Sequence, residues 1–351
     1  MARLRRTLPG DFKELVAAGD AGKIKAALKK CEPDAYEDNS RRKSALMNPD
    51  LPEEIVRWLV TEYGADVNYT DRYGYTPLSE AAVRRPERID LLLSLGAQID
   101  FRKDEQSPTA LMAAATSYSV AGVRRLAERG ANLRLTGGGS GFNALEEALL
   151  RCQNIDIPAM AAIARLFIGA GVTITDAMRA LVVNIGRNFE FYRDSFASDY
   201  LSFCDEGLRE LYQLFDVPPV PPIKKYDGST PIAVRGKTWT EQYAGLWELL
   251  VPGSGKAAYV QGEAIRIIGR LSHEVLDNGG ANWDDDFRAM RDARAVDLSG
   301  GRPAGENIIR AVRGISPQTG EETFNEIAEA VVGWILSNPQ PVELKAVSYR
   351  R

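Results

Sequence analysis

The chain has 351 residues and 44% of them are hydrophobic, which is enough for two structural units with buried cores. Its formal net charge is −4 and is spread along the chain, so no part has the basic excess that nucleic acid binding requires. No stretch approaches the roughly 18 apolar residues of a membrane helix, and no apolar run follows the first arginines, so we expect neither a membrane span nor a secretory signal. Three widely separated cysteines fit a reducing compartment, and we expect a cytoplasmic protein.

Residues 1–37 predict an N-terminal capping unit. Between residues 11 and 31, two short helical patterns flank the turn at Gly19-Asp20. Both patterns are polar and imperfect. Such a unit suits the end of a helical stack, because its outer face meets water.

One helix-start pattern recurs through residues 38–175. It reads Ser44-Ala-Leu46, Thr76-Pro77-Leu78, Thr109-Ala-Leu111 and Asn143-Ala-Leu145, at spacings of 32, 33 and 34 residues. The first residue can cap a helix, and the leucine begins its apolar face. Gly64, Gly96, Gly130 and Gly171 suit the ends of the second helices. Each unit is therefore expected to hold two helices and a turn.

This repeat resembles the ankyrin family, whose units of about 33 residues contain two helices and a turn. The unit that resembles it best is 71–102. There Ser79 replaces the histidine that usually follows Thr-Pro-Leu, so one inter-repeat hydrogen bond of the family is not expected. An insertion at 151–158 lengthens the last unit.

Helical periodicity without the repeat continues through residues 176–217, which we interpret as a modified C-terminal cap. Its middle, 188–196, is rich in aromatic residues, which either seal the last repeat or form a partner-facing patch. Residues 218–238 begin with four prolines in five positions and predict an extended linker. The prolines could alternatively be a ligand for the groove of another protein.

Residues 239–336 predict a small helical domain. Helical patterns cover 239–251, 257–277, a segment from Trp283, 306–313 and 321–336, with a loop at 297–305. The tail, 337–351, is expected to be loosely held. The predicted fold class is therefore all-α, an ankyrin-repeat solenoid with degenerate caps followed by a C-terminal helical domain.

No pattern indicates a catalytic, metal or cofactor site. The segment Gly253-Ser-Gly255-Lys256 lacks the other residues of a phosphate-binding loop, although a backbone anion site at this helix start stays open. Asp284 to Asp286 diverge around a helix and suit a cap. His273 is the only histidine and has no second zinc ligand at the required spacing. We expect no enzyme activity; an enzyme that uses the C-terminal helical domain is the least favoured alternative.

The ankyrin resemblance implies a concave protein-binding face, formed by the turns between repeats and by the first helices. Transferred to this chain, it places the following residues at the binding surface: Tyr69, Arg72, Tyr73, Tyr75, Arg84, Phe101, Arg102, Lys103, Tyr118 and Phe142. Exposed tyrosine, phenylalanine and arginine are well suited as binding anchors. Alternatively, some of them pack only against neighbouring turns.

The whole chain also resembles a kind of bacterial ankyrin-repeat protein, through Leu8-Pro-x-Asp11-Phe12, Phe215-Asp-Val-Pro-Pro219 and Val260-Gln-Gly-Glu263. Some short relatives of that kind are immunity partners of toxins. The resemblance implies an inhibitor that blocks one protein, such as a toxin or effector, by steric occlusion. A general interaction scaffold or regulator remains the alternative.

Overall fold

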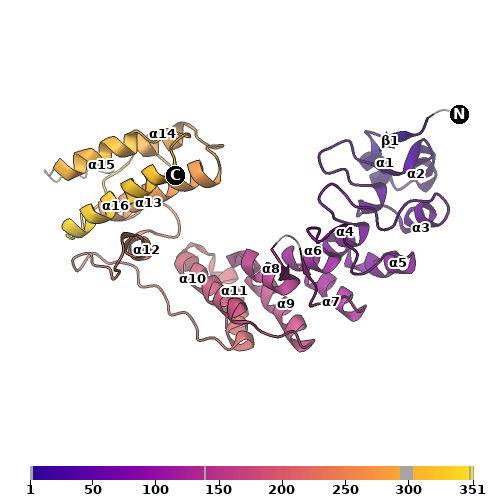
Figure 1. Cartoon of the computed structure of the whole chain (residues 1–351), viewed down its shortest axis with the longest axis horizontal. Coiled ribbons are helices and arrows are strands. Elements are labelled where there is room, and N and C mark those ends of the chain that lie inside the picture. Colours follow the sequence, from indigo (N-terminus) through magenta and orange to yellow (C-terminus); the bar gives the residue numbers. More distant parts are fainter. Residues whose placement is uncertain (1–2, 138–139, 293–302, 348, 351) are drawn as a thin grey trace. The chain divides into compact units, whose positions relative to one another are not determined.

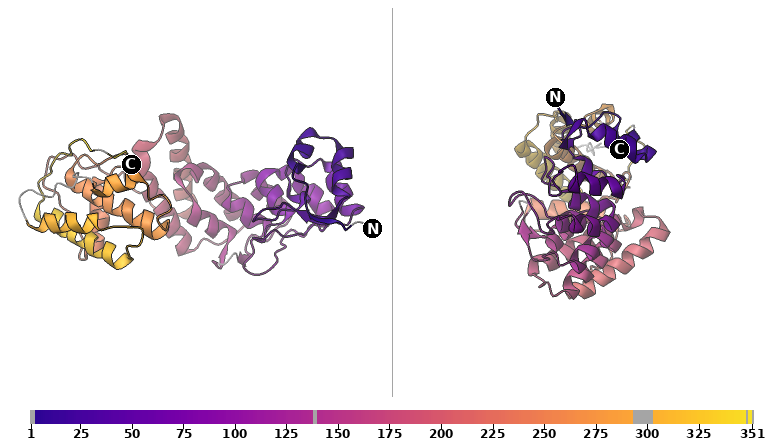
Figure 2. Two further views of the ribbon diagram at one scale, coloured as in Figure 1. Left: turned by 90° about the horizontal axis from the view of Figure 1, so that it is seen from above. Right: turned by 90° about the vertical axis from the view of Figure 1, so that its right-hand side faces the viewer.

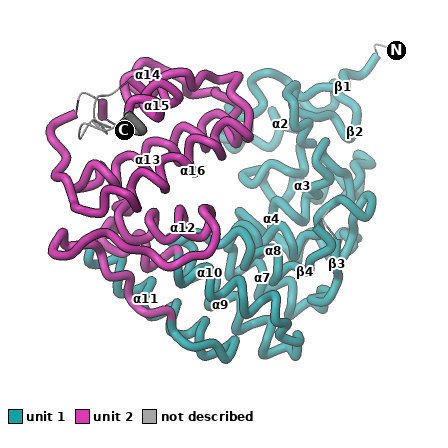
Figure 3. Tube along the Cα trace, turned by 60° about the vertical axis from the view of Figure 1, so that its left-hand side comes forward, with its two compact units in different colours: residues 1–187, 198–219 teal, residues 188–197, 220–351 magenta. Residues whose placement is uncertain are grey.

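The computed structural model describes residues 3–137, 140–292, 303–347, 349 and 350. The chain is mostly helical, which confirms the predicted class at that level (Figure 1). It divides into two compact units: unit 1 comprises residues 1–187 and 198–219, and unit 2 comprises 188–197 and 220–351 (Figure 3). Within the described part, no helix is both long and apolar enough to cross a membrane.

The N-terminal segment contains a small sheet that the sequence did not predict. Its elements are β1 (Arg5–Thr7), α1 (Phe12–Ala18), α2 (Ala21–Leu28) and β2 (Cys31–Tyr36). The two strands pair in parallel, and Leu8 N donates to Tyr36 O at 2.8 Å. The purely helical expectation is therefore wrong here. β1 has only three residues, and β2 contains Pro33 and shows no strict apolar–polar alternation, so only the folded chain reveals the pairing.

The second repeat has lost its first helix. Its elements are a 3₁₀ turn, η1 (Ala45–Met47), and the helix α3 (Glu53–Thr61). Asn48 is extended, because the following Pro49 disfavours a helical conformation in the residue before it. The start pattern at Ser44 therefore leads into a turn of three residues.

The next three repeats each contain the two predicted helices. Their elements are α4 (Pro77–Arg84), η2 (Pro86–Arg88) and α5 (Ile89–Ser94); α6 (Ala110–Thr116) and α7 (Val120–Glu128); and β3 (Thr136–Gly137), β4 (Phe142–Asn143), α8 (Ala144–Arg151), η3 (Asn154–Asp156) and α9 (Ile157–Gly169). The expected caps are present: the side chains of Thr76, Thr109 and Asn143 each accept a backbone hydrogen bond from the first turn of their helix.

Successive repeats of unit 1 stack through both layers of helices (Figures 1 and 2). The first helices α4, α6 and α8 pack in series, and so do the second helices α5, α7 and α9. Hydrogen bonds also join the turns of successive repeats. The side chains of Asp34, Asn68 and Asp100 each accept a bond from a backbone N–H of the next repeat, at 2.8–3.0 Å. These features recur at about the predicted period and make this part of unit 1 a stack of helical repeats.

Two long helices, α10 (Asp176–Tyr192) and α11 (Ser198–Phe215), follow the repeats, with η4 (Arg193–Ser195) between them. α11 packs against α9. The aromatic stretch between them belongs mainly to the core, because Phe189 is buried and Phe191 packs against the core of unit 2. Of the aromatic residues in this stretch, Tyr192 alone is exposed, and residues 188–197 group with unit 2.

The remainder of unit 2 is a helical domain. Its elements are α12 (Trp239–Leu250), α13 (Val260–Ser272), a π-helical turn η5 (His273–Asp277), α14 (Asp285–Asp292), α15 (Pro303–Arg313) and α16 (Glu321–Ser337). The core lies where α13 packs against α12 and α16. The predicted loop at 297–305 falls largely outside the described residues, and Pro303 already begins α15.

The C-terminal tail is held in place, contrary to the expectation of a loose end. Leu344 N donates to Ala258 O at 2.9 Å, and Val260 N donates to Val342 O at 2.8 Å. Tyr349 is buried, and its hydroxyl hydrogen-bonds the buried Glu263. The groups that bind the tail lie on α13 or just before it, far away in the sequence, so the composition of the tail does not reveal them.

Candidate functional site

The candidate site is the side of unit 1 that carries the first helices and the turns before them. It contains two hollows. Hollow A measures about 640 Å³ and is lined by Leu8, Phe12, Lys13, Val16, Ala17, Glu37, Lys43, Ser44, Met47, Asn48, Pro49, Asp50 and Arg84. Hollow B measures about 340 Å³ and is lined by Tyr73, Tyr75, Gln106, Pro108, Met112, Thr116, Gly137, Phe142, Glu147 and Arg151.

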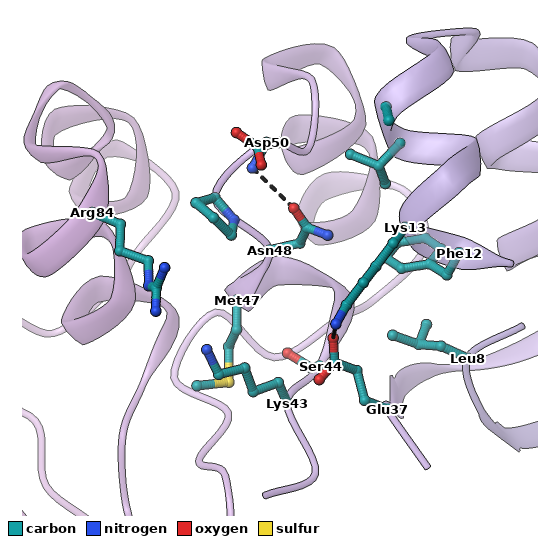
Figure 4. A pocket seen from close by; sticks show the side chains of 13 residues that line it. Leu8, Phe12, Lys13, Glu37, Lys43, Ser44, Met47, Asn48, Asp50 and Arg84 are labelled. Atoms are coloured by element: carbon teal, nitrogen blue, oxygen red, sulfur yellow. Dashed lines mark hydrogen bonds and ion pairs between the residues drawn. The ribbon is translucent and has the colours of Figure 1, made fainter. Parts of the chain in front are cut away.

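Hollow A lies beside the truncated first helix of the second repeat. Its wall comes from α1, its floor from η1 and its far rim from the last residue of α4 (Figure 4). Where Thr76 and Thr109 cap the helices that follow them, Ser44 precedes only a 3₁₀ turn. Its hydroxyl is buried and makes no hydrogen bond within the described part of the chain. The lost helix therefore accounts for both the hollow and the unsatisfied hydroxyl.

Charged groups of both signs surround the apolar floor of hollow A. Figure 4 shows Arg84 and Lys13 on opposite sides. Lys13 pairs with Glu37 at 3.8 Å, and Lys43 pairs with Glu80 at 2.7 Å. Because the cations already face carboxylates, hollow A is polar at its rim without a strong net charge.

Hollow B has an aromatic wall. Tyr73 and Tyr75 come from the turn before α4, and Phe142 comes from β4 in the turn before α8. The side chain of Tyr73 is 58% exposed, which is unusual for so large a ring. Met112 of α6 also lines the hollow and is apolar. Tyr73 and Tyr75 lie 69 and 67 residues before Phe142 in the sequence, so distant segments meet at one site.

A buried charge network holds the two tyrosines in position. The carboxylate of Asp71 accepts backbone hydrogen bonds from Tyr73 N at 2.9 Å and Tyr75 N at 3.0 Å. It also accepts Arg41 Nε at 2.6 Å, and Arg41 bridges to Glu80. The turn is thereby tied to the preceding repeat, so the aromatic wall is preorganised.

An ion pair between Arg151 and Glu147 also lines hollow B. Arg151 Nε lies 2.7 Å and Arg151 Nη2 lies 2.5 Å from Glu147 Oε1. The two residues are four apart on α8, a spacing that places them on one helix face. Both guanidinium nitrogens therefore approach the same carboxylate oxygen.

The predicted binding residues do not form one patch. Tyr73, Tyr75 and Phe142 converge on hollow B, and Arg84 reaches hollow A. Three others bond backbone carbonyl groups of other segments: Tyr69 with Arg42, Arg102 with Thr136, and Tyr118 with Ala148. Burial also raises the pKa of Tyr69 and of Tyr118. Arg72 and Lys103 are exposed and Phe101 is half-buried, all outside both hollows.

Several lining residues were not predicted. Glu147 was missed, although its spacing from Arg151 is a local signal that could have indicated it. Lys13, Glu37 and Lys43 were missed because hollow A exists only where a helix fails to form.

The residues weighed as catalytic or metal-binding candidates have other contacts. Lys256 Nζ lies 5.1 Å from the centre of the Tyr349 ring, and His273 Nδ1 lies 2.7 Å from Asp277 Oδ2. Asp284 caps α14 by accepting from Phe287 N at 3.0 Å. Among residues 3–137, 140–292, 303–347, 349 and 350, no group of three or more His, Cys, Asp or Glu side chains is placed to hold a metal ion.

Comparison with known proteins yields a limited likeness. No protein-family model and no curated protein matches the sequence. Among solved structures, one similar chain is an ankyrin repeat domain from Acinetobacter baumannii AYE, with 24% identity and a TM-score of 0.39 over 58% of this chain and 95% of that chain. At that level the likeness does not assign a family, and what the structure shows of unit 1 is a series of capped, stacked helix pairs.

Proposed function

We propose that unit 1 is a protein-binding module and that hollow B receives the main anchor of its partner. The observation that carries this proposal is the convergence of Tyr73, Tyr75 and Phe142 on one hollow. Aromatic side chains held in position lose little conformational entropy on binding, and such residues dominate the binding energy of many interfaces.

The finer proposal is that the module inhibits one protein, as an immunity protein inhibits its toxin, by covering that protein's active surface. It is supported by the resemblance to bacterial ankyrin-repeat proteins and by the preorganised turn, which favours a single tight partner over several weak ones. A scaffold would instead have several partners of lower affinity.

The proposal can be tested by purifying tagged protein from its native cells and quantifying bound proteins by mass spectrometry. The double variant Tyr73→Ala/Phe142→Ala should lose the specific partner while its thermal unfolding stays close to that of the wild type. Ile155→Ala/Phe203→Ala is the matched control, because it removes two exposed apolar side chains of unit 1 outside hollow B.

The partner that is identified should then be titrated against the purified protein and assayed for its own activity. Tight one-to-one binding that abolishes this activity is expected for an inhibitor. A partner that binds both double variants equally would show that hollow B is not the anchor. Binding without loss of the partner's activity would leave a binding module but exclude the inhibitor.

A further inference from the structure

We propose that residues 217–223 are a docking segment for a protein whose groove is lined with aromatic side chains. The segment reads Val-Pro-Pro-Val-Pro-Pro-Ile and lies between α11 and α12, where unit 1 ends and unit 2 begins (Figure 1). The inference goes beyond the proposed function, because this segment does not line hollow B. Three properties suit the segment to this role: its conformation, the exposure of its prolines and its free backbone carbonyls.

The conformation of the segment follows from its prolines. Each residue from 217 to 222 is a proline, precedes a proline, or both. The proline ring fixes φ at about −65°, and a following proline disfavours the helical region for the residue before it. Both restrictions favour polyproline II, a left-handed helix with three residues per turn. The segment accordingly forms neither helix nor strand, and it loses little conformational entropy when it binds.

The exposure of the side chains follows the same period of three. The four prolines are all exposed. The aliphatic residues are half-buried, namely Val217, Val220 and Ile223. In polyproline II, residues three apart share one edge, so Pro218 lies with Pro221 and Pro219 lies with Pro222 on two edges that face solvent. A spacer requires only a stiff backbone, whereas a ligand also requires that its prolines stay accessible.

The backbone carbonyls of the segment are also available to a partner. None of the carbonyls of residues 217–223 accepts a hydrogen bond from the described part of the chain. A backbone bond nevertheless holds each end. Val217 N donates to Tyr212 O at 3.1 Å, and Tyr226 N donates to Leu249 O at 3.3 Å. The segment therefore presents acceptors in a fixed position.

These properties fit a groove walled by aromatic rings. Such grooves recognise preformed polyproline II segments in which two prolines stand three residues apart. A donor between the rings would bond the free carbonyls. Lys224, directly after the segment, is exposed, so an acidic side chain at one end of the groove would fix the orientation of the segment. We expect the partner to be a protein domain with an aromatic groove and an acidic end.

The test is isothermal titration calorimetry of the full chain against a panel of isolated SH3 and WW domains, which have aromatic-lined grooves. A synthetic peptide of residues 214–226 represents the free segment. We expect at least one domain to bind the full chain with a Kd on the order of 100 µM, and no more weakly than it binds the peptide, because the segment is already ordered. The peptide should compete with the chain for that domain.

Pro218→Ala/Pro221→Ala removes one exposed edge and should weaken binding by at least about tenfold. Pro231→Ala is the matched control, because it removes an exposed proline outside the segment. Lys224→Gln should weaken binding by about threefold, whereas Lys237→Gln, at another exposed position before α12, should leave it unchanged. Circular dichroism verifies that the variants fold like the wild type.

Several results would overturn the docking segment. One is the absence of binding to the whole panel, and another is a domain that binds the peptide but not the full chain. Wild-type affinity of Pro218→Ala/Pro221→Ala would leave the segment as a spacer only. Weaker binding by Tyr73→Ala/Phe142→Ala would also contradict the inference, because the domain would then occupy hollow B. Undiminished binding by that variant would support two separate sites.

Discussion

Asp71 shows how one buried carboxylate can organise the turn that lines hollow B. It accepts two backbone N–H groups of its own turn and the guanidinium group of Arg41 from the preceding repeat. Its side chain has no exposed surface, so each of these bonds replaces a lost contact with water. The positions of Tyr73 and Tyr75 therefore depend on a residue that does not line hollow B.

Asp71→Asn should lower the free energy of unfolding of unit 1 by about 2 to 3 kcal/mol, because it leaves Arg41 without one buried partner. Urea unfolding followed by circular dichroism measures the change. Asp50→Asn is the matched control: its carboxylate pairs with Arg85 at the exposed surface, and we expect a loss below about 1 kcal/mol. Equal effects of the two substitutions would contradict the organising role of Asp71.

Asp90 predicts an acid dependence of unit 1. Hydrogen bonds from Arg129 and then Arg125 lower the pKa of its carboxyl from 3.8 to about 2. Because the folded pKa lies below the ordinary value, the stabilisation is complete above pH 3.8 and is lost as the pH falls towards 2.

Arg129→Gln should therefore reduce stability most at neutral pH, and its difference from the wild type should shrink as the pH falls through this range. Urea midpoints between pH 6 and pH 2.5 measure the difference. Arg124→Gln, an exposed neighbour on α7, is the control and should show no such convergence. NMR titration of Asp90 should give the lowered pKa directly.

At the scale of elements, the contact between α4 and α7 depends on the absence of a side chain. A Cβ at Gly122 would lie 1.9 Å from Ala82 O and 2.9 Å from Ala82 C, both backbone atoms that cannot rotate away. Ser119 Oγ donates to the same carbonyl at 2.7 Å. The second helix of one repeat thus approaches the first helix of the preceding one closely enough to bond its backbone.

Gly122→Ala should consequently destabilise unit 1 by about 1 to 3 kcal/mol, although alanine favours a helix, because the two helices must move apart. Gly169→Ala is the matched control. It also lies in a helix, but a Cβ there meets nothing within 4 Å, so stability should stay the same or increase. Thermal unfolding of both variants separates the two effects. A stabilised Gly122→Ala protein would contradict the close approach.

In the second repeat, the local helix-start pattern does not produce a helix. Ser44-Ala-Leu46 follows the repeat period, yet only η1 forms there. Asn48 and Pro49 interrupt the helix within one turn, and Arg88 donates to Asn48 O at 2.9 Å, which holds the interrupting loop against the next repeat. The consequence of that loop, hollow A, depends on the neighbours α1 and α4.

At the scale of the whole molecule, each unit has its own buried core and its own charge network. In unit 2, Glu263 is buried, which disfavours its charge, but hydrogen bonds from Arg266, Tyr349 and the Ala257 N–H lower its pKa overall. Gln261, also buried, bonds three backbone groups of the tail. α13 therefore closes unit 2 by fixing the C-terminal segment.

Gln261→Leu should release the tail and lower the free energy of unfolding of unit 2 by about 2 to 4 kcal/mol, because three backbone groups lose their partner. Hydrogen exchange with mass spectrometry should show faster exchange at residues 339–347 and unchanged protection of α6 and α8. Gln318→Leu, at an exposed position, is the control. Faster exchange in both units would show that their stabilities are not separable.

The sequence by itself determined the helix starts at Thr76, Thr109 and Asn143, the period of the repeat and the apolar stripes of unit 2. A cap is a bond between residues three apart, and a stripe depends on the pitch of one helix, so both are local properties. The expectation that Tyr73, Tyr75 and Phe142 lie on one side of the chain came instead from the ankyrin resemblance.

Only the tertiary structure decided which of the ten predicted binding residues meet. Tyr69, Arg102 and Tyr118 bond neighbouring segments, whereas Glu147 and Arg151 complete hollow B. It also decided that the C-terminal tail is held in place and that the second repeat lacks its first helix. Each outcome depends on atoms that are distant in the sequence and adjacent in space. The strength of such a contact depends on how deeply it is buried and on which hydrogen-bond partners surround it, and neither can be read from a local pattern.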